Sequence, residues 1–561
     1  MFATPGQPRR AARLAGAAAL ALVPAAARAQ DATGLAPFAF PPAGAVLNAP
    51  LESPLGATPA EPRAPAWTFR PAIGAQELFN DNIYQTESDR RADLITAITP
   101  ELEVHGDTPR LNLNLRYAPV LEFYTRTPSA DAVAQNLLGT ATATLVPETL
   151  FVNARALASV QPSGGGLGGL GDTALAAPSL PAGNGLGTDA LPGVLALGKE
   201  NRAQTASFAV TPYAQHRFGT FGTGKVGVTL SASVISADAG TAPIPGTVSA
   251  GTQRQETGEA TAQFQSGEAF GRVRDFVLLD AARSSGTGVL AGARADIATN
   301  WVGYAVNRAV TPFAEFGAES ISYNTVPRLR IDDAVWELGV VLTPNPDSQI
   351  SIGYGHHQGI DALDIRGYYA LSARTRLTVS YTTALASEVQ LLQSQLGLAA
   401  FDALDNPVDQ TTGAPLFLGN GLLSTQDALF RNRTLSLTAT TLLGERDSVA
   451  LSLQHQQQTP IGSVNPAERG VGEDGTTLGA SWTHQLSELT SLGASASYTR
   501  ITYQVVPTVQ ESVIGATVGA SHRLSETVTT FARYALLDRA SGYAGRSFTD
   551  NVVLIGIRKQ F

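Results

Sequence analysis

The sequence contains no cysteine, and lysine occurs only at Lys199, Lys225 and Lys559. The absence of cysteine excludes disulfides, thiolate metal sites and a lipidated N-terminal cysteine. Charged residues make up only 15% of the 561 residues, and the net charge is −9. A negative chain with so few lysines argues against a nucleic-acid partner.

Long hydrophobic runs are also missing, since no segment reaches the roughly 20 apolar residues of a membrane-spanning helix. The longest apolar run follows Arg9, Arg10 and Arg13 and covers residues 14–23, before the small-residue site Ala27-Arg28-Ala29. This pattern predicts a Sec-type signal peptide over 1–29, because the run is too short for a membrane anchor. Residues 30–66, rich in proline and alanine, are predicted to form a disordered periplasmic linker.

From Trp67 onward the sequence alternates between apolar and polar residues with a period of two. In "RLNLNLRY", Leu111, Leu113 and Leu115 share one face, and Asn112 and Asn114 share the other. Similar runs of about ten residues continue to the C-terminus, and their polar faces carry mostly uncharged side chains. The pattern predicts an all-β domain over 67–561.

The connections between these runs alternate between short and long. Short ones include 106–109, 147–148, 373–374 and 524–526, and the longest are 163–200 and 389–428. This alternation predicts a transmembrane antiparallel up-and-down β-barrel of about 22 strands, within a range of roughly 16 to 22, with short periplasmic turns and long outer loops. A soluble all-β fold such as a propeller is disfavoured because no fixed sequence period of about 40–50 residues occurs.

The final residues are predicted to form the closing strand, paired with the first strand near 68–79. Val553, Ile555, Ile557 and Phe561 would face lipid and resemble the C-terminal signal that barrel-insertion machinery reads. Lys559 interrupts this face, but its ammonium can reach the interface. Ten aromatic residues near strand ends suit interfacial girdles: Phe79, Phe123, Tyr124, Phe218, Phe221, Trp301, Tyr354, Trp482, Tyr503 and Phe531.

The opposite parity predicts which charged residues face the lumen. They are Arg116, Glu315, Glu319, Glu337, Asp364, Arg366, Arg376, Arg523, Arg533 and Arg558. Mixed charge among Ser, Thr, Asn and Gln suits a hydrated conduit for a polar solute. The alternative is that these charges pair with one another across the wall and only stabilise it.

Two motifs could carry chemistry. Gly166, Gly168 and Gly171 match G-x-G-x-x-G, but they lie between strands without a following helix, so a loop is the better interpretation. His356 and His357 lie near Asp361 and Asp364, but adjacent strand residues point to opposite faces, which argues against a metal site. We therefore predict no catalytic residue, metal or cofactor, and no enzymatic activity.

The segment 386–404 has the pattern of a helix. Leu392, Leu396 and Phe401 could share one stripe. Two placements remain open: a constriction or plug inside the lumen, or a loop helix that packs on its neighbours outside.

The segment 74–128 resembles the outer-membrane β-barrel proteins associated with exosortase/PEP-CTERM systems. The resemblance rests on "FNDN" at 79–82, on "DLITAITP" at 93–100 and on the glycine-to-tyrosine run at 106–117. Residues 210–226 and 336–357 resemble the same family more loosely, and the inserts 163–200 and 389–428 depart from it. The resemblance implies an outer-membrane location in a Gram-negative bacterium and a link to exopolysaccharide export.

Together these features predict a pore or accessory barrel for exopolysaccharide export. The alternatives are a general diffusion porin, a structural surface barrel with a closed lumen and, least favoured, an outer-membrane hydrolase. The expected partners are outer-membrane lipid and lipopolysaccharide, the barrel-insertion machinery, periplasmic chaperones and components of exopolysaccharide export.

Overall fold

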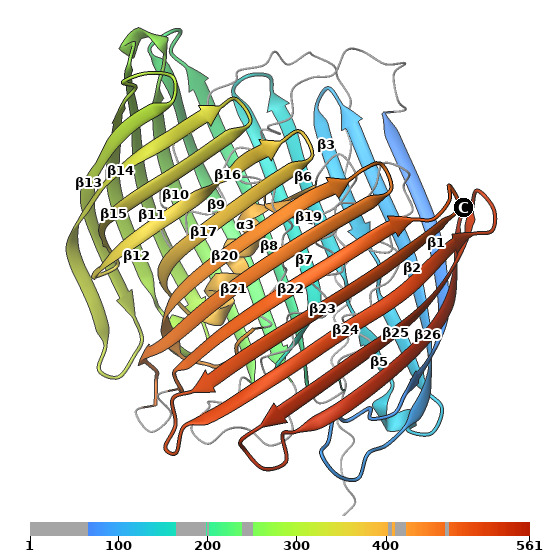
Figure 1. Ribbon diagram of the computed structural model, residues 1–561. Helices are drawn as coiled ribbons and strands as arrows, with labels where there is room; N and C mark the ends of the chain where they lie inside the picture. The colour runs from blue at the N-terminus through green and yellow to red at the C-terminus, as the bar shows by residue number, and fades with distance from the viewer. Residues whose placement is uncertain are drawn as a thin grey trace, which may run out of the picture.

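The computed structural model describes residues 66–163, 198, 201–237, 251–401, 407–409, 422–465 and 470–561. The predicted signal peptide and all of the linker except Ala66 lie outside these residues, as do most of 163–200 and much of 389–428. Figure 1 shows the strands inclined around one closed ring, so the predicted antiparallel β-barrel is confirmed.

The barrel has 22 strand positions. The first half consists of β1 (Trp67–Asn80), β2 (Asp93–Thr108), β3 (Leu111–Tyr117), β6 (Leu137–Val146), β7 (Leu150–Pro162), β8 (Arg202–Arg217), β9 (Gly222–Ala237), β10 (Thr252–Ser266), β11 (Val273–Gly286), β12 (Arg294–Tyr304) and β13 (Val310–Tyr323). The second half consists of β14 (Leu329–Asn345), β15 (Ser348–His357), β16 (Ile360–Ser372), β17 (Thr375–Ala386), β20 (Leu429–Leu443), β21 (Asp447–Gly462), β22 (Glu473–Gln485), β23 (Thr490–Tyr503), β24 (Val509–Arg523), β25 (Val528–Ser541) and β26 (Phe548–Gln560).

Two shorter strands extend positions already counted. β4 (Val120–Tyr124) continues β3 along β2, and β5 (Ala132–Ala134) pairs with β4 just before β6 begins. Between them lies the 3-10 helix η2 (Pro128–Ala130); two more, η4 (Glu268–Phe270) and η5 (Gly288–Leu290), lie in later connections. A separate pair, β18 (Ala399–Phe401) with β19 (Pro407–Asp409), lies outside the barrel sheet.

The ring closes between the first and last strands, as predicted. β26 runs antiparallel to β1, in a register from Ala72 opposite Gln560 to Asn80 opposite Val552. The Phe561 N–H donates to the Pro71 carbonyl at 2.9 Å. The last residue is thus held by backbone pairing, which explains a strand pattern that continues to the end of the sequence.

Short turns gather at one end of the barrel, which we call the turn end and which also holds the start of β1 and the end of β26. The connections at the opposite loop end are mostly longer, for example 81–92, 324–328 and 387–428. One connection departs from the predicted alternation, because β15 and β16 are joined at the loop end by Gln358 and Gly359 alone. Both residues have positive φ, 54° and 71°, as in the tight turns that match strand twist.

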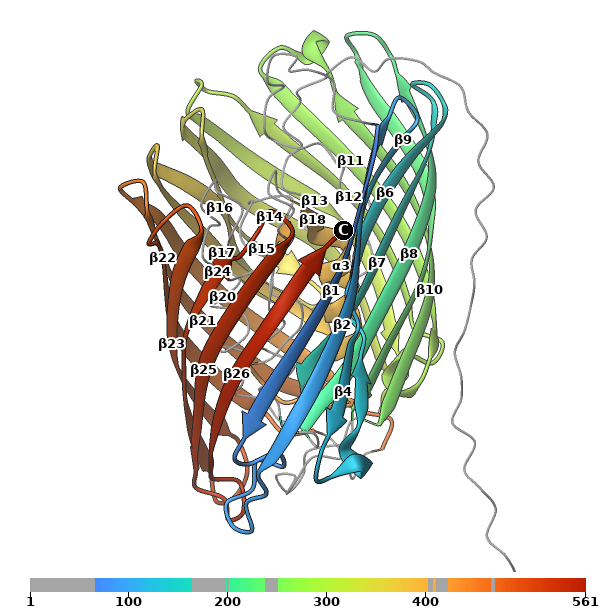
Figure 2. The ribbon, with the colours of Figure 1, turned by 90° about the vertical axis from the view of Figure 1, so that its right-hand side faces the viewer.

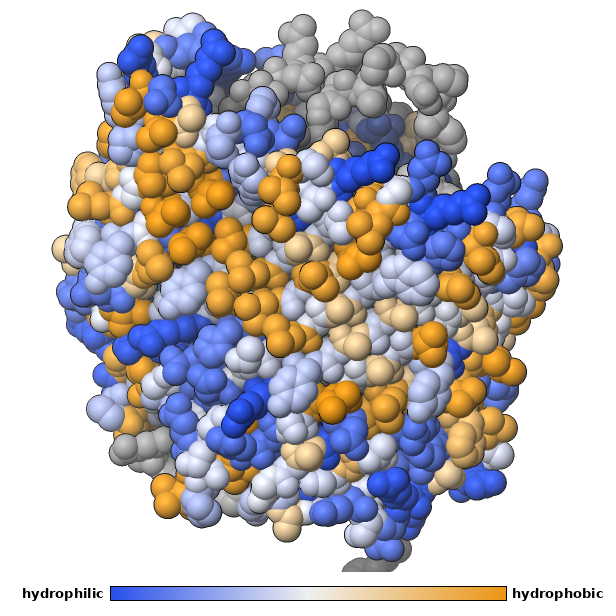
Figure 3. All heavy atoms as spheres, in the orientation of Figure 1, coloured by the Kyte–Doolittle hydropathy of each residue, from blue (hydrophilic) through white to orange (hydrophobic). Residues whose placement is uncertain are grey.

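The outward face is apolar, because alternate residues of each strand point away from the barrel. On β9, Val226, Val228 and Leu230 are exposed, whereas Thr229 and Ser231 are buried on the inward side. Figure 3 shows hydrophobic side chains spread across the face built from β13–β17 and β20–β26. Such a surface suits lipid contact.

The predicted aromatic girdle is only partly correct. Six of the ten aromatic residues are exposed: Phe79, Phe123, Phe218, Phe221, Tyr354 and Trp482. The other four, Tyr124, Trp301, Tyr503 and Phe531, are buried. Each of these four shares the parity of inward-facing neighbours, such as Glu122 beside Tyr124. Strand parity, and not closeness to a strand end, decides which aromatic residues can reach lipid.

The interior is not empty. The helix α3 (Glu388–Leu398) lies inside the ring in both ribbon views, and it contacts β7, β8 and β9 (Figures 1 and 2). Within the part of the chain that the structure describes, no helix is long and apolar enough to cross a membrane.

Candidate functional site: a lumen crossed by a helix and lined with charge

Both ends of α3 are capped by side chains. At its start, the Ser387 N–H donates to Oε1 of Gln390 at 3.0 Å, the reciprocal bond of a capping box. At its end, the buried Arg155 guanidinium donates to the carbonyls of Leu396 and Gly397. A cation at a helix C-terminus satisfies unpaired carbonyls and interacts favourably with the helix dipole. Arg155 belongs to β7, so this contact fixes the helix to the barrel wall.

Further polar contacts join α3 to several parts of the ring. Nε2 of Gln393 donates to the Ser231 hydroxyl of β9 at 2.5 Å. Nε2 of Gln390 donates to the Tyr323 hydroxyl of β13 at 3.4 Å, and Nε2 of Gln458, on β21, donates to Glu388 at 2.5 Å. Because β7 and β21 lie on opposite sides of the ring, α3 bridges the lumen.

Apolar side chains fill the space around the helix. Val389, Leu392 and Leu396 are buried in one cluster with inward residues of the wall such as Leu157 and Ile235. The two leucines are those predicted to form a constriction, and the helix lies in the lumen, one of the two placements left open. The side chain of Phe401 lies outside the described residues. The role of these residues in restricting passage stays a prediction.

Half of the predicted lumen residues gather on one part of the wall. Glu315 and Glu319 on β13, Glu337 on β14, and Asp364 with Arg366 on β16 are all inward-facing. Arg366 pairs with Asp364, whose Oδ2 lies 3.2 Å from Nη2. Glu319 accepts a hydrogen bond from the Gly359 N–H at 3.3 Å. We call Glu315, Glu319, Glu337 and Asp364 the acidic wall.

His357 joins the acidic wall, whereas His356 does not. Nε2 of His357 lies 3.4 Å from Oε2 of Glu337. Nδ1 of His356 lies 2.7 Å from Oδ1 of Asp361, its cross-strand partner. The two histidines thus lie on opposite faces, as expected for neighbours in a strand.

The remaining predicted lumen residues are spread around the ring. Arg116 and Arg558 both bind Glu101, at 3.0 and 2.8 Å. Arg376 lies 4.4 Å from the ring centroid of Tyr368, and Nη2 of Arg523 donates to the Glu488 carbonyl. Arg533 is buried on β25. Several of these arginines therefore have partners within the protein.

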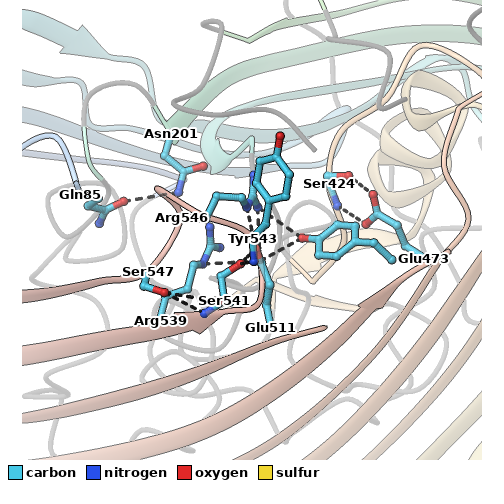
Figure 4. Close-up of polar contacts among 11 residues, drawn as sticks. Gln85, Asn201, Ser424, Glu473, Glu511, Arg539, Ser541, Tyr543, Arg546 and Ser547 are labelled. Carbon is cyan, nitrogen blue, oxygen red and sulfur yellow. Dashed lines mark hydrogen bonds and ion pairs between the residues drawn. The ribbon is translucent and has the colours of Figure 1, made fainter. Parts of the chain in front are cut away.

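A second charged group lies at the loop end. Oε1 of Glu511 lies 2.6 Å from Nε of Arg546, and Oε2 lies 3.9 Å from Nε of Arg539. The hydroxyls of Tyr503 and Ser541 also donate to this carboxylate, at 3.2 and 2.7 Å. Figure 4 shows Glu511 of β24, Arg539 and Ser541 of β25 and Arg546 of the 542–547 connection pointing toward one another. We call these four residues and Tyr503 the mouth network.

The mouth network changes the acidity of its loop member. Burial alone lowers the pKa of Arg546, but Tyr503 and Glu511 outweigh this effect and raise the pKa above its ordinary value. Arg546 therefore stays charged at any physiological pH.

Beside the mouth network, Glu473 holds the returning part of the long 387–428 connection (Figure 4). Its carboxylate accepts hydrogen bonds from the Ser424 N–H at 2.8 Å, from the Ser424 hydroxyl, and from Nε2 of Gln426 at 2.7 Å. Leu422 and Leu423 pack there against Ile501 and Tyr503. The connection thus returns along the inner wall.

Sequence reasoning missed several of these residues, among them Glu101, Arg155, Glu473, Glu511, Arg539 and Arg546. Strand parity was available for most of them, since Glu101 and Arg155 share the parity of inward neighbours. Strand parity could not show which other residue each of these side chains contacts. Arg155 and the Gly397 carbonyl are 242 positions apart, and only the closed ring brings them together.

Comparisons with known proteins agree with this architecture. The family model "Putative beta-barrel porin 2" matches residues 467–561, which include β22–β26, the last of which closes the ring. The chain has a porin-like β-barrel fold of the outer-membrane type. A search of the curated proteins found no match.

Several solved structures resemble the barrel at low sequence identity. The FrpB iron transporter from Neisseria meningitidis is 9% identical, with a TM-score of 0.48, over 88% of this chain and 82% of that one. The ferric-catecholate import receptor Fiu from E. coli K12 is 11% identical, with a TM-score of 0.45, over 88% and 81%. OccK2 (OpdF) from Pseudomonas aeruginosa is 8% identical, with a TM-score of 0.33, over 88% and 98%.

Proposed function

We propose that the protein is a constricted outer-membrane conduit, exported by the Sec pathway in a Gram-negative bacterium, that serves exopolysaccharide export. The observation that carries the conduit is α3, which crosses the lumen and is bonded to β7, β9, β13 and β21. A helix attached mainly by side chains can leave the lumen at far lower cost than a wall strand, whose backbone bonds would break. The matched family is described as a porin, and we propose no catalytic activity.

The chemistry of the lumen supports a polar solute. Inward hydroxyls face one another across neighbouring strands, as in Ser207 with Ser233 at 2.7 Å and Thr477 with Thr499 at 2.8 Å. Such a surface offers donors and acceptors to sugar hydroxyls without a strong charge. The choice of exopolysaccharide rests on the resemblance of residues 74–128 to barrels of exosortase/PEP-CTERM systems.

Planar-bilayer conductance tests the conduit. We expect little conductance from the whole protein and a clear rise when residues 388–398 are replaced by a Gly-Ser linker. A matched control replaces the turn 524–527 with a linker of the same kind and should behave as the whole protein does. If neither the whole protein nor the helix replacement conducts, the export conduit and the general diffusion porin are both wrong.

Secretion tests the substrate. Deleting the gene should lower the amount of extracellular polysaccharide, and a plasmid copy should restore it. Unchanged secretion after deletion would rule out the export role but leave the conduit intact. The barrel would then act on another polar solute.

A second candidate is a structural surface barrel with a closed lumen. It is favoured by the apolar cluster around α3, which joins the helix to several wall strands. The conductance experiment separates the two, because a structural plug that only stabilises the barrel would leave a destabilised, aggregating protein once residues 388–398 are replaced.

A further inference from the structure

Three inward side chains from neighbouring strands converge beside the tight turn that joins β15 to β16. Glu315 of β13 and Glu337 of β14 are direct cross-strand partners, and His357 is the last residue of β15. One ligand atom from each of them lies within 4.8 Å of the other two. The tight turn at Gln358 and Gly359 starts immediately after His357 and limits the movement of its backbone.

The backbone next to these side chains is cleared by glycine. A Cβ atom added to Gly353 would lie 1.7 Å from Oε1 of Glu337, and one added to Gly355 would lie 2.7 Å from the Glu337 Cβ. The Glu337 carboxylate therefore occupies space that any other residue at position 353 would fill. This recess is built into the "IGYGHH" strand, where Tyr354 between the two glycines faces outward.

Charge around the recess is not balanced by the wall itself. Glu319 and Asp364 lie beside the three residues, and Arg366 forms an ion pair with Asp364, so carboxylates outnumber positive charges here. Glu337 is only 4% exposed, and its Oε2 has no hydrogen-bond donor among the described residues. A buried carboxylate without a donor is costly unless a proton or a cation neutralises it. Nε2 of His357 lies 3.4 Å from the same Oε2 atom, so an imidazole nitrogen and a carboxylate oxygen face one another.

We propose that Glu315, Glu337 and His357 form a binding site for a divalent transition-metal ion of the zinc class. Two carboxylate oxygens and one imidazole nitrogen leave a fourth position for water or for a group in the lumen, as in open zinc sites. Ligand atoms of a tetrahedral zinc ion lie roughly 3–3.6 Å apart, so small side-chain rotations close the site. The imidazole disfavours magnesium and calcium, which prefer oxygen ligands and more of them. The proposal does not depend on what the barrel transports.

Calorimetric titration of the tag-free, folded barrel with Zn²⁺ tests the site. We expect one ion per chain, not displaced by excess Mg²⁺. Glu337→Gln and His357→Gln should each weaken binding at least about 100-fold, since losing a ligand costs more than losing a supporting residue. Matched controls are Glu259→Gln, an inward carboxylate on β10, and His522→Gln on β24; both should bind as the wild type does.

A second measurement reports the ligands of the bound ion in the wild-type protein directly. Co²⁺ bound to the wild-type protein should show the visible absorption of a low-coordinate site with a nitrogen ligand, and Glu315→Gln should reduce it. Heat-modifiable migration on gels confirms that each variant tested is a folded barrel. Absence of Zn²⁺ binding to the wild type would mean that protons neutralise the carboxylates, and would overturn the proposal. The proposal would also be overturned if Glu337→Gln and His357→Gln bound Zn²⁺ as tightly as the wild type does.

Discussion

The acidic wall and the mouth network are both buried groups of charge on the inside of one barrel, but they are balanced differently. In the mouth network, two arginines and two hydroxyls surround the single carboxylate of Glu511. In the acidic wall, four carboxylates face Arg366 and His357, and Arg366 belongs to Asp364. Arginines outnumber the carboxylate in the first group, whereas carboxylates outnumber the positively charged side chains in the second.

This difference separates two uses of inward charge. Charges that pair within the wall hold strands and loops in place, which is one of the two interpretations that the sequence left open. Charges that remain unbalanced are available to a proton, a cation or a solute. The predicted lumen residues therefore fall into two groups: Arg116 and Arg558 pair with Glu101, whereas Glu315 and Glu337 lie in the acidic wall.

The largest expected effect comes from neutralising the mouth network. Glu511→Gln leaves Arg539 and Arg546 buried without a counter-charge, so the free energy of unfolding should fall by about 3–5 kcal/mol. Glu337→Gln is the matched change in the acidic wall and should alter the metal-free protein by less than about 1 kcal/mol, because it removes a like-charge neighbour. Urea unfolding in lipid vesicles measures both. Equal losses would show that the two groups are balanced alike.

The next effect tests the glycine recess of the acidic wall. Gly353→Ala places a methyl group against Oε1 of Glu337 and should destabilise the barrel by about 1–3 kcal/mol. Adding Glu337→Ala should recover most of the loss, because the clash disappears. Gly251→Ala is a control, since a Cβ there meets nothing within 4 Å. Independent, additive effects of the two substitutions would contradict the recess.

A somewhat smaller effect is expected for the pairing near the closing seam. Glu101→Gln removes the shared partner of Arg116 and Arg558, whose side chains remain 23% and 14% exposed and can reach water. The loss should be about 1–2 kcal/mol, below that of Glu511→Gln. Glu103→Gln, which affects a 3.8 Å contact to Arg116 and a 4.0 Å contact to Arg70, should cost less than about 1 kcal/mol.

The smallest effect on stability is expected at the last residue. Phe561 is 67% exposed, and its ring lies 5.1 Å from Nζ of Lys559. Phe561→Ala keeps the backbone bond to Pro71, so unfolding should change by less than about 0.5 kcal/mol. We nevertheless expect slower insertion by the barrel-insertion machinery, measured as the appearance of heat-modifiable protein in cells. Val506→Ala, at an exposed loop-end position, should insert normally.

Much of the fold was predictable because the face to which each side chain of a strand points is a local property of the backbone. Period-two alternation assigns Val553, Ile555 and Ile557 to one face whatever their partners are, and all three are exposed. Alternating short and long connections gave the even strand number and the closing pair of β1 with β26. The four inward aromatic residues show the limit, since position near a strand end was used where parity was needed.

The sequence by itself determined which side of the wall each residue faces, because that depends only on the backbone period. It could not decide which inward residues meet, because that depends on register, on closure of the ring and on what fills it. Arg155 donates to Oδ1 of Asn153 in its own strand, and in the closed barrel it also caps a helix from a distant loop. Glu337 and His357 likewise become neighbours only when β14 and β15 pair in this register. The tertiary structure decided these encounters because lipid outside forces every strand to pair, and the closed ring then presents distant segments to one enclosed space.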